Sequence, residues 1–421
     1  MSVKNKAGFP FRYLVIGIVL LLWTTIYFQR INISVLLVDH KFLADMGLIG
    51  KGARQGLLMT LYLVVYSISN MLLAPLGDKI GPRKTILLAF ALAIASMTAG
   101  GFAVSFGMVL TTRIILGVGQ GIYFPAQNIL VNNWFPPSER GLANGIYGLG
   151  GCLGPILGIP IFTSVVRNYS WEWTFFFGAI MGAVFCIPLM AGVVSDKPSN
   201  NKYIRRAEKD YICQTEPQTE LGNKTRSLIW PVITSFNFWL AAISYMAYLS
   251  IWWGVMTWLP QYLTVARGFS LEAMGWGSTA PYFAAIAGVL GGGYVSDHMR
   301  RREVCCFIGL ALSTVFLLTA TYSSSNVVCI TFMALAVGMA EFYWAPLWAL
   351  VQTMLPDEVM GTCTGIINGS ANLVSAAAPL VMGILIQSSH NYEAGLLYLA
   401  IFGAVGAVGL LMLLRRPVCK Y

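Results

Sequence analysis

Charged side chains are scarce in this sequence. Asp, Glu, Lys and Arg make up only 10% of its 421 residues, whereas 57% of the residues are hydrophobic and the mean hydropathy is +0.69. A typical soluble domain carries about 25% charged residues. This chain cannot cover a folded surface with charge, which excludes an ordinary soluble globular protein and indicates lipid as the surrounding solvent.

Histidine is scarcer still. The three histidines are His40, His298 and His390, and all fall in or beside predicted loops. The eight cysteines are scattered, most of them inside apolar runs, without the spacing of metal ligands. No nucleophile and base pair, metal cluster or phosphate-binding loop occurs in the sequence. We therefore expect neither an enzyme nor a metal, cofactor or disulfide framework.

Long apolar runs are abundant. About 20 consecutive apolar residues are needed to cross a bilayer as a helix, because lipid leaves no partner for an unbonded backbone group. Twelve runs satisfy this: 13–38, 55–76, 85–106, 108–131, 142–166, 173–195, 230–258, 272–295, 304–322, 326–352, 361–388 and 393–414. The sequence therefore predicts an all-α membrane protein with twelve transmembrane helices.

The basic residues predict the orientation of these helices. Most of the 27 Lys and Arg residues lie on the side of the two termini, and the opposite side carries only Lys41, Lys51, Arg54, Arg167 and Arg267. By the positive-inside rule both termini are cytoplasmic, in a cell (inner) membrane. The formal charge of +10 then reflects topology, and we expect contact with lipid rather than with nucleic acid.

One long polar stretch divides the apolar runs six and six. We predict an N-terminal half at 1–195, a cytoplasmic linker at 196–228 and a C-terminal half at 229–421. Each half carries a similar loop after its second apolar run, with Asp78, Lys79 and Arg83 in the first copy and Asp297 and Arg301 in a degenerate second copy. A topogenic cluster of basic residues is the alternative reading of each loop.

The first of these loops resembles the loop signature of the major facilitator superfamily. The resemblance implies the major facilitator fold, twelve helices in two parallel six-helix repeats, with a substrate site near the midplane between them. It also implies that Asp78, Lys79, Arg83, Asp297 and Arg301 act at a cytoplasmic gate, where the Asp caps a neighbouring helix and pairs with an Arg. A Gly-Pro motif around Gly154 resembles one found in many antiporters, for which close helix packing is the alternative reading.

Three charged residues remain in the interior of the predicted spans: Arg30, Arg113 and Glu341. Each costs about 2.5–3.5 kcal/mol on insertion scales, so such residues face a cavity or a partner. The two arginines lie at nearly the same depth, and no acidic residue accompanies them inside the predicted spans of the N-terminal half. They predict an anion site, because guanidinium binds carboxylate or phosphate in bidentate fashion. The alternative to anion binding is that Arg30 snorkels outward to the membrane surface and that Arg113 links helices by hydrogen bonds to carbonyls.

Helical spacing predicts which residues line this site. Tyr27 lies one turn before Arg30, Gln120 lies two turns after Arg113, and the second span carries Tyr66. Aromatic and amide groups around Arg suit a small organic acid with hydroxyls or a ring. Any one aromatic residue could instead be a packing residue. For Glu341 we keep two hypotheses, a proton-coupling carboxyl and a protonated carboxyl that hydrogen-bonds between helices.

Segments 27–34, 121–128 and 133–140 resemble the anion:cation symporter family, which includes sugar-acid transporters. The resemblance implies that Arg30 contacts a substrate carboxylate, and that Tyr66, Trp348 and Asn368 fall at sugar-acid-binding positions. Proton-coupled members carry acidic residues where this chain has Gln29 and Gln120, and an amide cannot titrate.

The sequence thus predicts a monomeric secondary transporter of a small organic anion, such as a sugar acid or another carboxylate, that works by alternating access. The sequence leaves the energy source of transport undecided. Co-transport with a proton or another ion would make the protein a symporter, and exchange of anions, drugs or organophosphates would make it an antiporter. A sensor that binds its ligand without transport is an alternative from a different class.

Overall fold

The structure is a computed structural model that describes residues 10–73, 75–136, 139–213, 230–299, 301–355 and 360–415. All regular secondary structure in these residues is helical. The N-terminal half contains α1 (Phe11–Leu36), α2 (His40–Asp45), α3 (Gly52–Leu72), α4 (Pro75–Ile80), α5 (Pro82–Gly101), α6 (Phe106–Trp134), α7 (Arg140–Gly148), α8 (Gly150–Asn168), α9 (Glu172–Ile180), the π-helical segment η1 (Met181–Cys186) and α10 (Ile187–Gly192).

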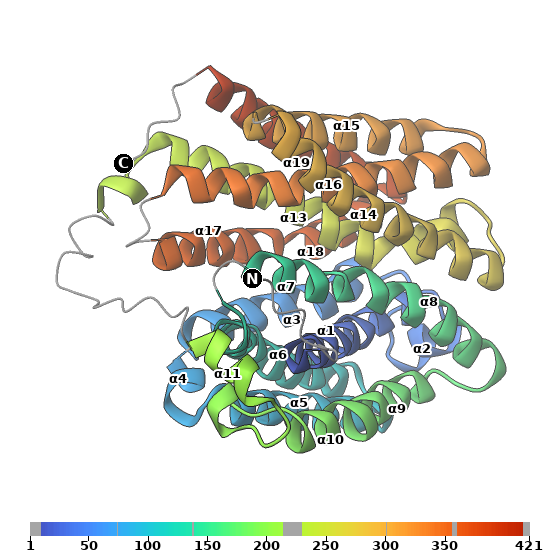
Figure 1. Cartoon of the computed structure of the whole chain (residues 1–421). Coiled ribbons are helices and arrows are strands. Elements are labelled where there is room, and N and C mark those ends of the chain that lie inside the picture. Colours follow the sequence, from blue (N-terminus) through green and yellow to red (C-terminus); the bar gives the residue numbers. More distant parts are fainter. Residues whose placement is uncertain are drawn as a thin grey trace.

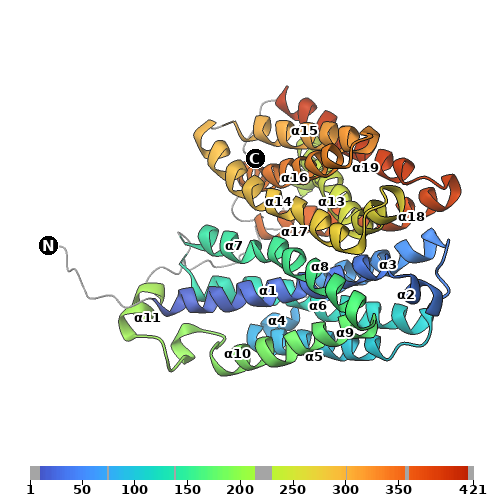
Figure 2. The ribbon, with the colours of Figure 1, turned by 90° about the vertical axis from the view of Figure 1, so that its right-hand side faces the viewer.

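The C-terminal half contains α13 (Phe236–Gln261), the π-helical segment η3 (Tyr262–Ala266), α14 (Leu271–Met299), α15 (Arg302–Tyr322), α16 (Asn326–Met354), α17 (Met360–Ser375), α18 (Ala378–Ser389) and α19 (Tyr392–Leu414). In two views at right angles the two halves form separate bundles that lie one above the other (Figures 1 and 2).

Eleven segments in the described part of the chain are long and apolar enough to cross a membrane. The twelfth predicted span, 272–295, is the 29-residue helix α14, which is long enough to cross a membrane and is rich in glycine. The glycines serve packing: a Cβ added at Gly288 would collide with the carbonyl of Gly338 on α16, and one at Gly292 with the carbonyl of Phe342. The twelve-helix prediction therefore holds, with α14 in the eighth place.

Several predicted edges differ from the observed ones. The seventh span was predicted from residue 230, but α13 begins at Phe236, after Ser235 in an extended conformation. The span 361–388 is divided into α17 and α18 at Ala376–Ala377, where Pro379 in the first turn of α18 cannot donate a backbone hydrogen bond. These breaks shift boundaries and leave the order of the spans unchanged.

The two halves meet tightly at the end of the molecule remote from the chain termini. A Cβ at Gly56 of α3 would collide with the carbonyl of Pro379 at the start of α18. The side chain of Gln261 on α13 donates to the carbonyl of Leu37 at 2.7 Å. Arg167 forms an exposed ion pair with Glu272 at 2.7 Å. This end is closed by direct contacts between backbones and polar side chains of the two halves.

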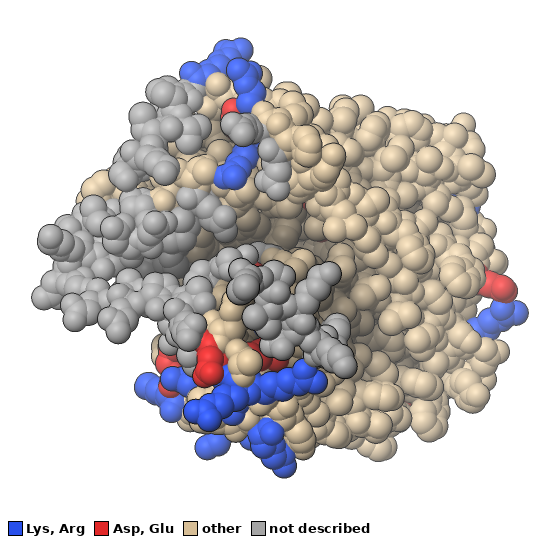
Figure 3. All heavy atoms as spheres, in the orientation of Figure 1, with Lys and Arg blue, Asp and Glu red and all other residues tan. Residues whose placement is uncertain are grey.

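The opposite end, near the termini, is more open. A Cβ added at Gly145 or Gly148 on α7, or at Gly365 on α17, would meet no atom within 4 Å. Leu142 at the start of α7 is exposed. The space-filling view shows a hollow between the two bundles (Figure 3). The central face of both bundles is therefore approached from the end that carries the termini.

The predicted linker begins as folded structure. It contains the short 3-10 turn η2 (Pro198–Asn200) and α11 (Arg206–Cys213), which lies at the start of α1 (Figure 2). The Glu208 carboxylate accepts the backbone N–H groups of Phe11 and Arg12 at 2.9 and 3.1 Å, and Arg12 pairs with Glu139 at 2.9 Å. A carboxylate from the linker thus caps the N-terminus of α1. Residues 214–229 lie outside the described part, and the boundaries at 195 and 228 remain predictions.

Candidate functional site

Arg30 lies on α1, and its side chain is 1% exposed. The guanidinium carbon is 4.6 Å from the ring centre of Tyr27 and 4.8 Å from that of Tyr66. Three further rings lie 5.5–5.6 Å away: Tyr62, Trp23 and Trp253. These distances are in the range of cation–π attraction. Aromatic residues from α1, α3 and α13 therefore surround the cation on several sides.

A chain of amide groups binds the guanidinium through its Nε atom. Arg30 Nε donates to Gln120 Oε1 at 3.0 Å, and the Tyr62 hydroxyl donates to the same oxygen at 2.7 Å. Gln120 Nε2 donates in turn to Gln29 Oε1 at 3.0 Å, and Gln29 Nε2 to the carbonyl of Gly178 on α9 at 3.0 Å. The Gly178 carbonyl can only accept a hydrogen bond, so Gln29 must turn its NH₂ group towards it. This fixes the orientation of the Gln29 amide, and of the Gln120 amide that donates to it. An uncharged network holds Arg30 in place.

The positive charge of Arg30 has no negative partner in the described residues. None of the three ion pairs found there includes Arg30, and its Nη2 atom is buried without a hydrogen-bond partner. A buried charge that is neither paired nor fully hydrogen-bonded is costly. An anion with acceptor oxygens would supply both the charge and the missing hydrogen bond.

Arg113 on α6 is equally buried but points elsewhere. Its Nη2 donates to Asn32 Oδ1 at 3.3 Å, its guanidinium carbon lies 5.5 Å from the ring centre of Phe175, and its Nε has no partner among the described residues. Tyr62 lies within electrostatic reach of both arginines. The structure thus brings Tyr27, Tyr66 and Gln120 to Arg30, and places Arg113 against α1 and α9.

A second polar cluster lies in the C-terminal half. The Tyr248 hydroxyl on α13 donates to Glu341 Oε1 on α16 at 2.5 Å. The neighbouring Tyr245 donates to Asn368 Oδ1 on α17 at 3.4 Å and meets Trp348 edge-on, with ring centres 5.2 Å apart. Three residues proposed from the sequence, Glu341, Trp348 and Asn368, are therefore gathered around two tyrosines of α13.

The two clusters face each other across the interface between the halves. Tyr27 of α1 stacks on Trp253 of α13, with ring centres 6.3 Å apart and an angle of 12° between the planes. Tyr27 also lies within electrostatic reach of both Arg30 and Glu341. A ligand between the halves would meet a cation on one side and a carboxyl with tyrosine hydroxyls on the other.

Sequence reasoning missed the contribution of α13. Tyr245, Tyr248 and Trp252 recur at intervals of three and four residues, and Trp253 follows directly. This spacing places aromatic residues on one side of a helix. The signal was hidden because almost every residue of α13 after Ser244 is buried, so the helix has no polar face that would mark its direction.

The residues predicted to form a gate lie at the open end. Asp78 and Lys79 are exposed on α4, and Asp78 takes part in none of the ion pairs of the described residues. Arg83 donates to the carbonyls of Met190 and Ala191. Asp196, rather than Asp78, accepts the backbone N–H of Arg83 at 2.7 Å and so caps α5.

In the second copy of the loop, Arg301 is exposed, and the side chain of Asp297 lies outside the described residues. The gating role of both copies remains a prediction.

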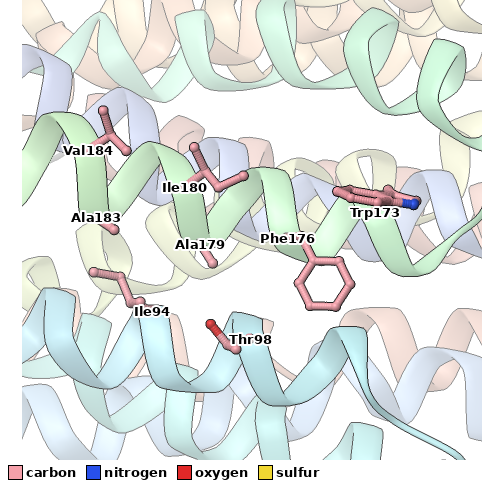
Figure 4. A pocket seen from close by; sticks show the side chains of 8 residues that line it. All are labelled: Ile94, Thr98, Trp173, Phe176, Ala179, Ile180, Ala183 and Val184. Atoms are coloured by element: carbon pink, nitrogen blue, oxygen red, sulfur yellow. The ribbon is translucent and has the colours of Figure 1, made fainter.

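An apolar groove of about 470 Å³ lies on the outer face between α5 and the α9–η1 segment (Figure 4). Its lining includes Ile94, Phe176 and Val184, and contains no charged residue. Trp173, Ile180 and Val184 are exposed there. The groove offers no positive charge to pair with an anion, and the polar clusters between the bundles are the candidate site.

The sequence model of the Major Facilitator Superfamily matches residues 13–271 and 241–420. The chain belongs to the Major Facilitator Superfamily. It is 27% identical to a probable sulfoacetate transporter of Cupriavidus necator, over 95% of this chain and 92% of the relative. It is 26% identical to a D-galactonate transporter of Escherichia coli, over 98% of each chain, and 26% identical to a hexuronate transporter of Bacillus subtilis, over 93% of each.

Solved structures of other transporters share the fold. A bacterial homolog of the human lysosomal transporter Spinster, in an inward-facing conformation, superposes with a TM-score of 0.78 at 16% identity, over 97% of this chain and 98% of the other. A D-xylose-proton symporter superposes with a TM-score of 0.76 at 14% identity, over 97% of this chain and 100% of the symporter. The predictions of a multi-pass membrane transporter, and of a transporter rather than an enzyme, are confirmed.

Proposed function

We propose that this protein is a secondary active transporter of a small organic anion, a sugar acid or another carboxylate, and that it works by alternating access. The observation that carries the proposal is the environment of Arg30. This guanidinium is buried between the two halves, is held by uncharged groups and retains one unpartnered N–H group. A carboxylate would complete its hydrogen bonds and balance its charge.

The relatives support the same class of substrate. The proteins of Escherichia coli and Bacillus subtilis are named for galactonate and hexuronate, and that of Cupriavidus necator for sulfoacetate. All three names denote small organic acids. The C-terminal cluster of Tyr245, Glu341, Trp348 and Asn368 offers acceptors, a hydroxyl and an aromatic face, which suit the hydroxyl-bearing end of a sugar acid.

The energy source follows from which groups can titrate. Gln29 and Gln120 occupy the hydrogen-bond network of Arg30 and carry no exchangeable charge. Glu341 is buried in the interior of α16, where its carboxyl meets Tyr248. We assign proton coupling to Glu341. The alternative is exchange of one anion for another, in which neither bundle needs a titratable group.

The glycines of the antiporter-like motif have a structural role that requires no exchange. A Cβ at Gly154 would collide with Tyr27 of α1, and one at Gly158 would lie 2.7 Å from a side-chain carbon of Ile31. These glycines allow α8 to approach α1 closely. Their spacing is therefore accounted for by packing, which leaves symport as the favoured mode.

The transport cycle would open the two ends in turn. The end remote from the termini is closed by contacts between α3 and α18, and the end near the termini is open between α7 and α17. With both termini in the cytoplasm of a cell (inner) membrane, the structure faces inward. Asp78, Lys79, Arg83, Asp297 and Arg301 would latch the cytoplasmic end of a monomer when the halves rock the other way.

The proposal is tested by thermal unfolding of the purified protein in detergent against D-galactonate, a hexuronate, sulfoacetate, amino acids and phosphate esters. A ligand at 100 times its dissociation constant stabilises the folded state by about 2.7 kcal/mol. We expect a shift with one class of carboxylate, its loss in Arg30→Ala, and its retention in Arg54→Ala, which removes an exposed arginine. Shifts with cationic or neutral compounds alone would refute the proposed substrate class.

The sensor alternative needs a separate measurement, since a sensor also binds. Proteoliposomes loaded with unlabelled acid should take up labelled acid by counterflow if the protein is a transporter. Binding without counterflow would identify a sensor instead.

A further inference from the structure

Trp253 on α13 carries a buried N–H group without a partner. The side chain is 2% exposed, and its indole Nε1 has no hydrogen-bond acceptor among the described residues. Buried indole N–H groups usually find an acceptor. Other buried tryptophans of this protein do so: Trp258, on the same helix, donates to the carbonyl of Pro379 at 2.9 Å, and Trp134 to that of Ser195 at 2.9 Å.

This unpartnered donor lies beside another one. The ring centre of Trp253 is 5.6 Å from the guanidinium carbon of Arg30, whose Nη2 is the other buried N–H group without a partner at this place. Tyr27 holds the two together, since it stacks on Trp253 and lies 4.6 Å from the guanidinium carbon. One donor belongs to the N-terminal half and the other to the C-terminal half.

We propose that the indole N–H of Trp253 is a second donor to the acid group of the substrate, which it shares with Arg30. A carboxylate has two oxygens with about four acceptor positions, enough to receive Arg30 Nη2 on one oxygen and Trp253 Nε1 on the other. The inference rests on the proposed function and adds a determinant of specificity. The substrate must present an oxoanion with at least two free oxygens, so a primary amide or alcohol of the same carbon skeleton is rejected.

The arrangement also gives the anion a mechanical role. Arg30 moves with the N-terminal half and Trp253 with the C-terminal half, so a carboxylate bound to both joins the bundles at the centre of the molecule. Two contacts already connect the halves at this place: the stacked rings of Tyr27 and Trp253, and the Arg30 guanidinium, whose carbon lies 5.6 Å from the ring centre of Trp253. Trp253 is therefore a positioning contact for the moving halves as well as a donor to the ligand.

The neighbouring Trp252 is a matched control. It lies on the same helix and is also buried, but it packs edge-on against Tyr282 of α14, with ring centres 5.7 Å apart. Substitution of either tryptophan by phenylalanine removes one N–H and one ring of the indole. Of the two, Trp253 is the one whose ring lies 5.6 Å from the Arg30 guanidinium carbon and whose buried N–H has no partner among the described residues.

The test measures dissociation constants for D-galactonate, a hexuronate and sulfoacetate by calorimetry, together with labelled counterflow. In Trp253→Phe we expect the tightest-binding of these acids to bind about 10-fold to 100-fold more weakly, as for loss of one hydrogen bond to a charged group. In Trp252→Phe we expect a change of less than about 3-fold, within the spread of ordinary packing effects. A primary amide of the same acid should bind equally weakly to wild type and Trp253→Phe.

Unchanged acid affinity in a folded Trp253→Phe, with affinity lost in Arg30→Ala, would overturn this inference and leave the proposed function intact. Failure of wild type to bind any of the three acids would overturn both. If Trp253→Phe does not fold, 3-benzothienylalanine at position 253 keeps the shape of the indole and removes only the N–H. The same loss of affinity is expected in that variant, and full affinity there would also overturn the inference.

Discussion

Replacement of Gln120 by Glu should convert the anion site into an internal ion pair. Gln120 Oε1 accepts from Arg30 Nε at 3.0 Å and from the Tyr62 hydroxyl at 2.7 Å. A glutamate carboxylate has nearly the same shape and would accept both bonds, but it adds a negative charge next to the one cation of this cluster. The substrate carboxylate would then compete with the carboxylate of the introduced glutamate for Arg30.

The size of this effect follows from the geometry. Two opposite charges about 4 Å apart attract by about 4 kcal/mol at an effective dielectric constant of about 20. Every 1.4 kcal/mol changes a binding constant about tenfold, so the affinity for a carboxylate should fall roughly a thousandfold at neutral pH. The introduced carboxylate competes only when ionised, so affinity should fall as the pH rises and recover as the pH is lowered.

The assay is calorimetric titration of wild type, Gln120→Glu and Gln120→Leu with the same acid at several pH values between about 5 and 8. Gln120→Leu is the control, because it removes the hydrogen bonds without adding charge. It should bind more weakly than wild type without the added pH dependence. An affinity and pH profile of Gln120→Glu equal to those of wild type would show that Arg30 does not bind the anion.

Three further outcomes are expected. Glu341→Gln should abolish uphill accumulation of the acid driven by a pH gradient while counterflow persists; accumulation at the wild-type level would exclude Glu341 as the coupling group. Glu208→Ala removes the carboxylate cap of α1 and should lower the stability of the N-terminal half by about 1–2 kcal/mol, seen as a lower midpoint in thermal unfolding. Asp210→Ala, an exposed change on the same helix, should not lower it. Gly56→Val places a side chain against the carbonyl of Pro379, so transport should stop and cysteines introduced at the remote end should become reactive; normal transport would contradict the closed contact.

Much of the fold and part of the site can be read from the sequence, because both follow from distances along a single helix. Tyr27 and Arg30 are one turn apart, and they remain neighbours in the structure. The apolar runs fix the number of spans, since lipid allows few alternatives to a continuous helix. Glu341 could be singled out from the sequence as a charged residue inside a predicted span, whereas Trp348 and Asn368 were expected only through the family resemblance. Their gathering with Glu341 around Tyr245 and Tyr248 depends on how α16 and α17 pack against α13.

The sequence could not predict which neighbouring helix each side chain points to. Arg30 and Arg113 share a depth, but depth does not fix the side to which a long side chain points, and Arg113 turns to Asn32 and Phe175. The place of Trp253 beside Arg30 depends on how the two halves pack, which no local pattern encodes. The π-helical segment after Ile180 is a similar case, since its sequence reads as an ordinary apolar helix.

The central claim is that Arg30 binds the acid group of a transported substrate. The most direct measurement is counterflow of labelled D-galactonate, hexuronate and sulfoacetate into proteoliposomes that contain wild type, Arg30→Ala or Arg54→Ala. We predict counterflow of at least one of these acids by wild type and Arg54→Ala, and none by a folded Arg30→Ala. Equal counterflow by Arg30→Ala and wild type would contradict the account.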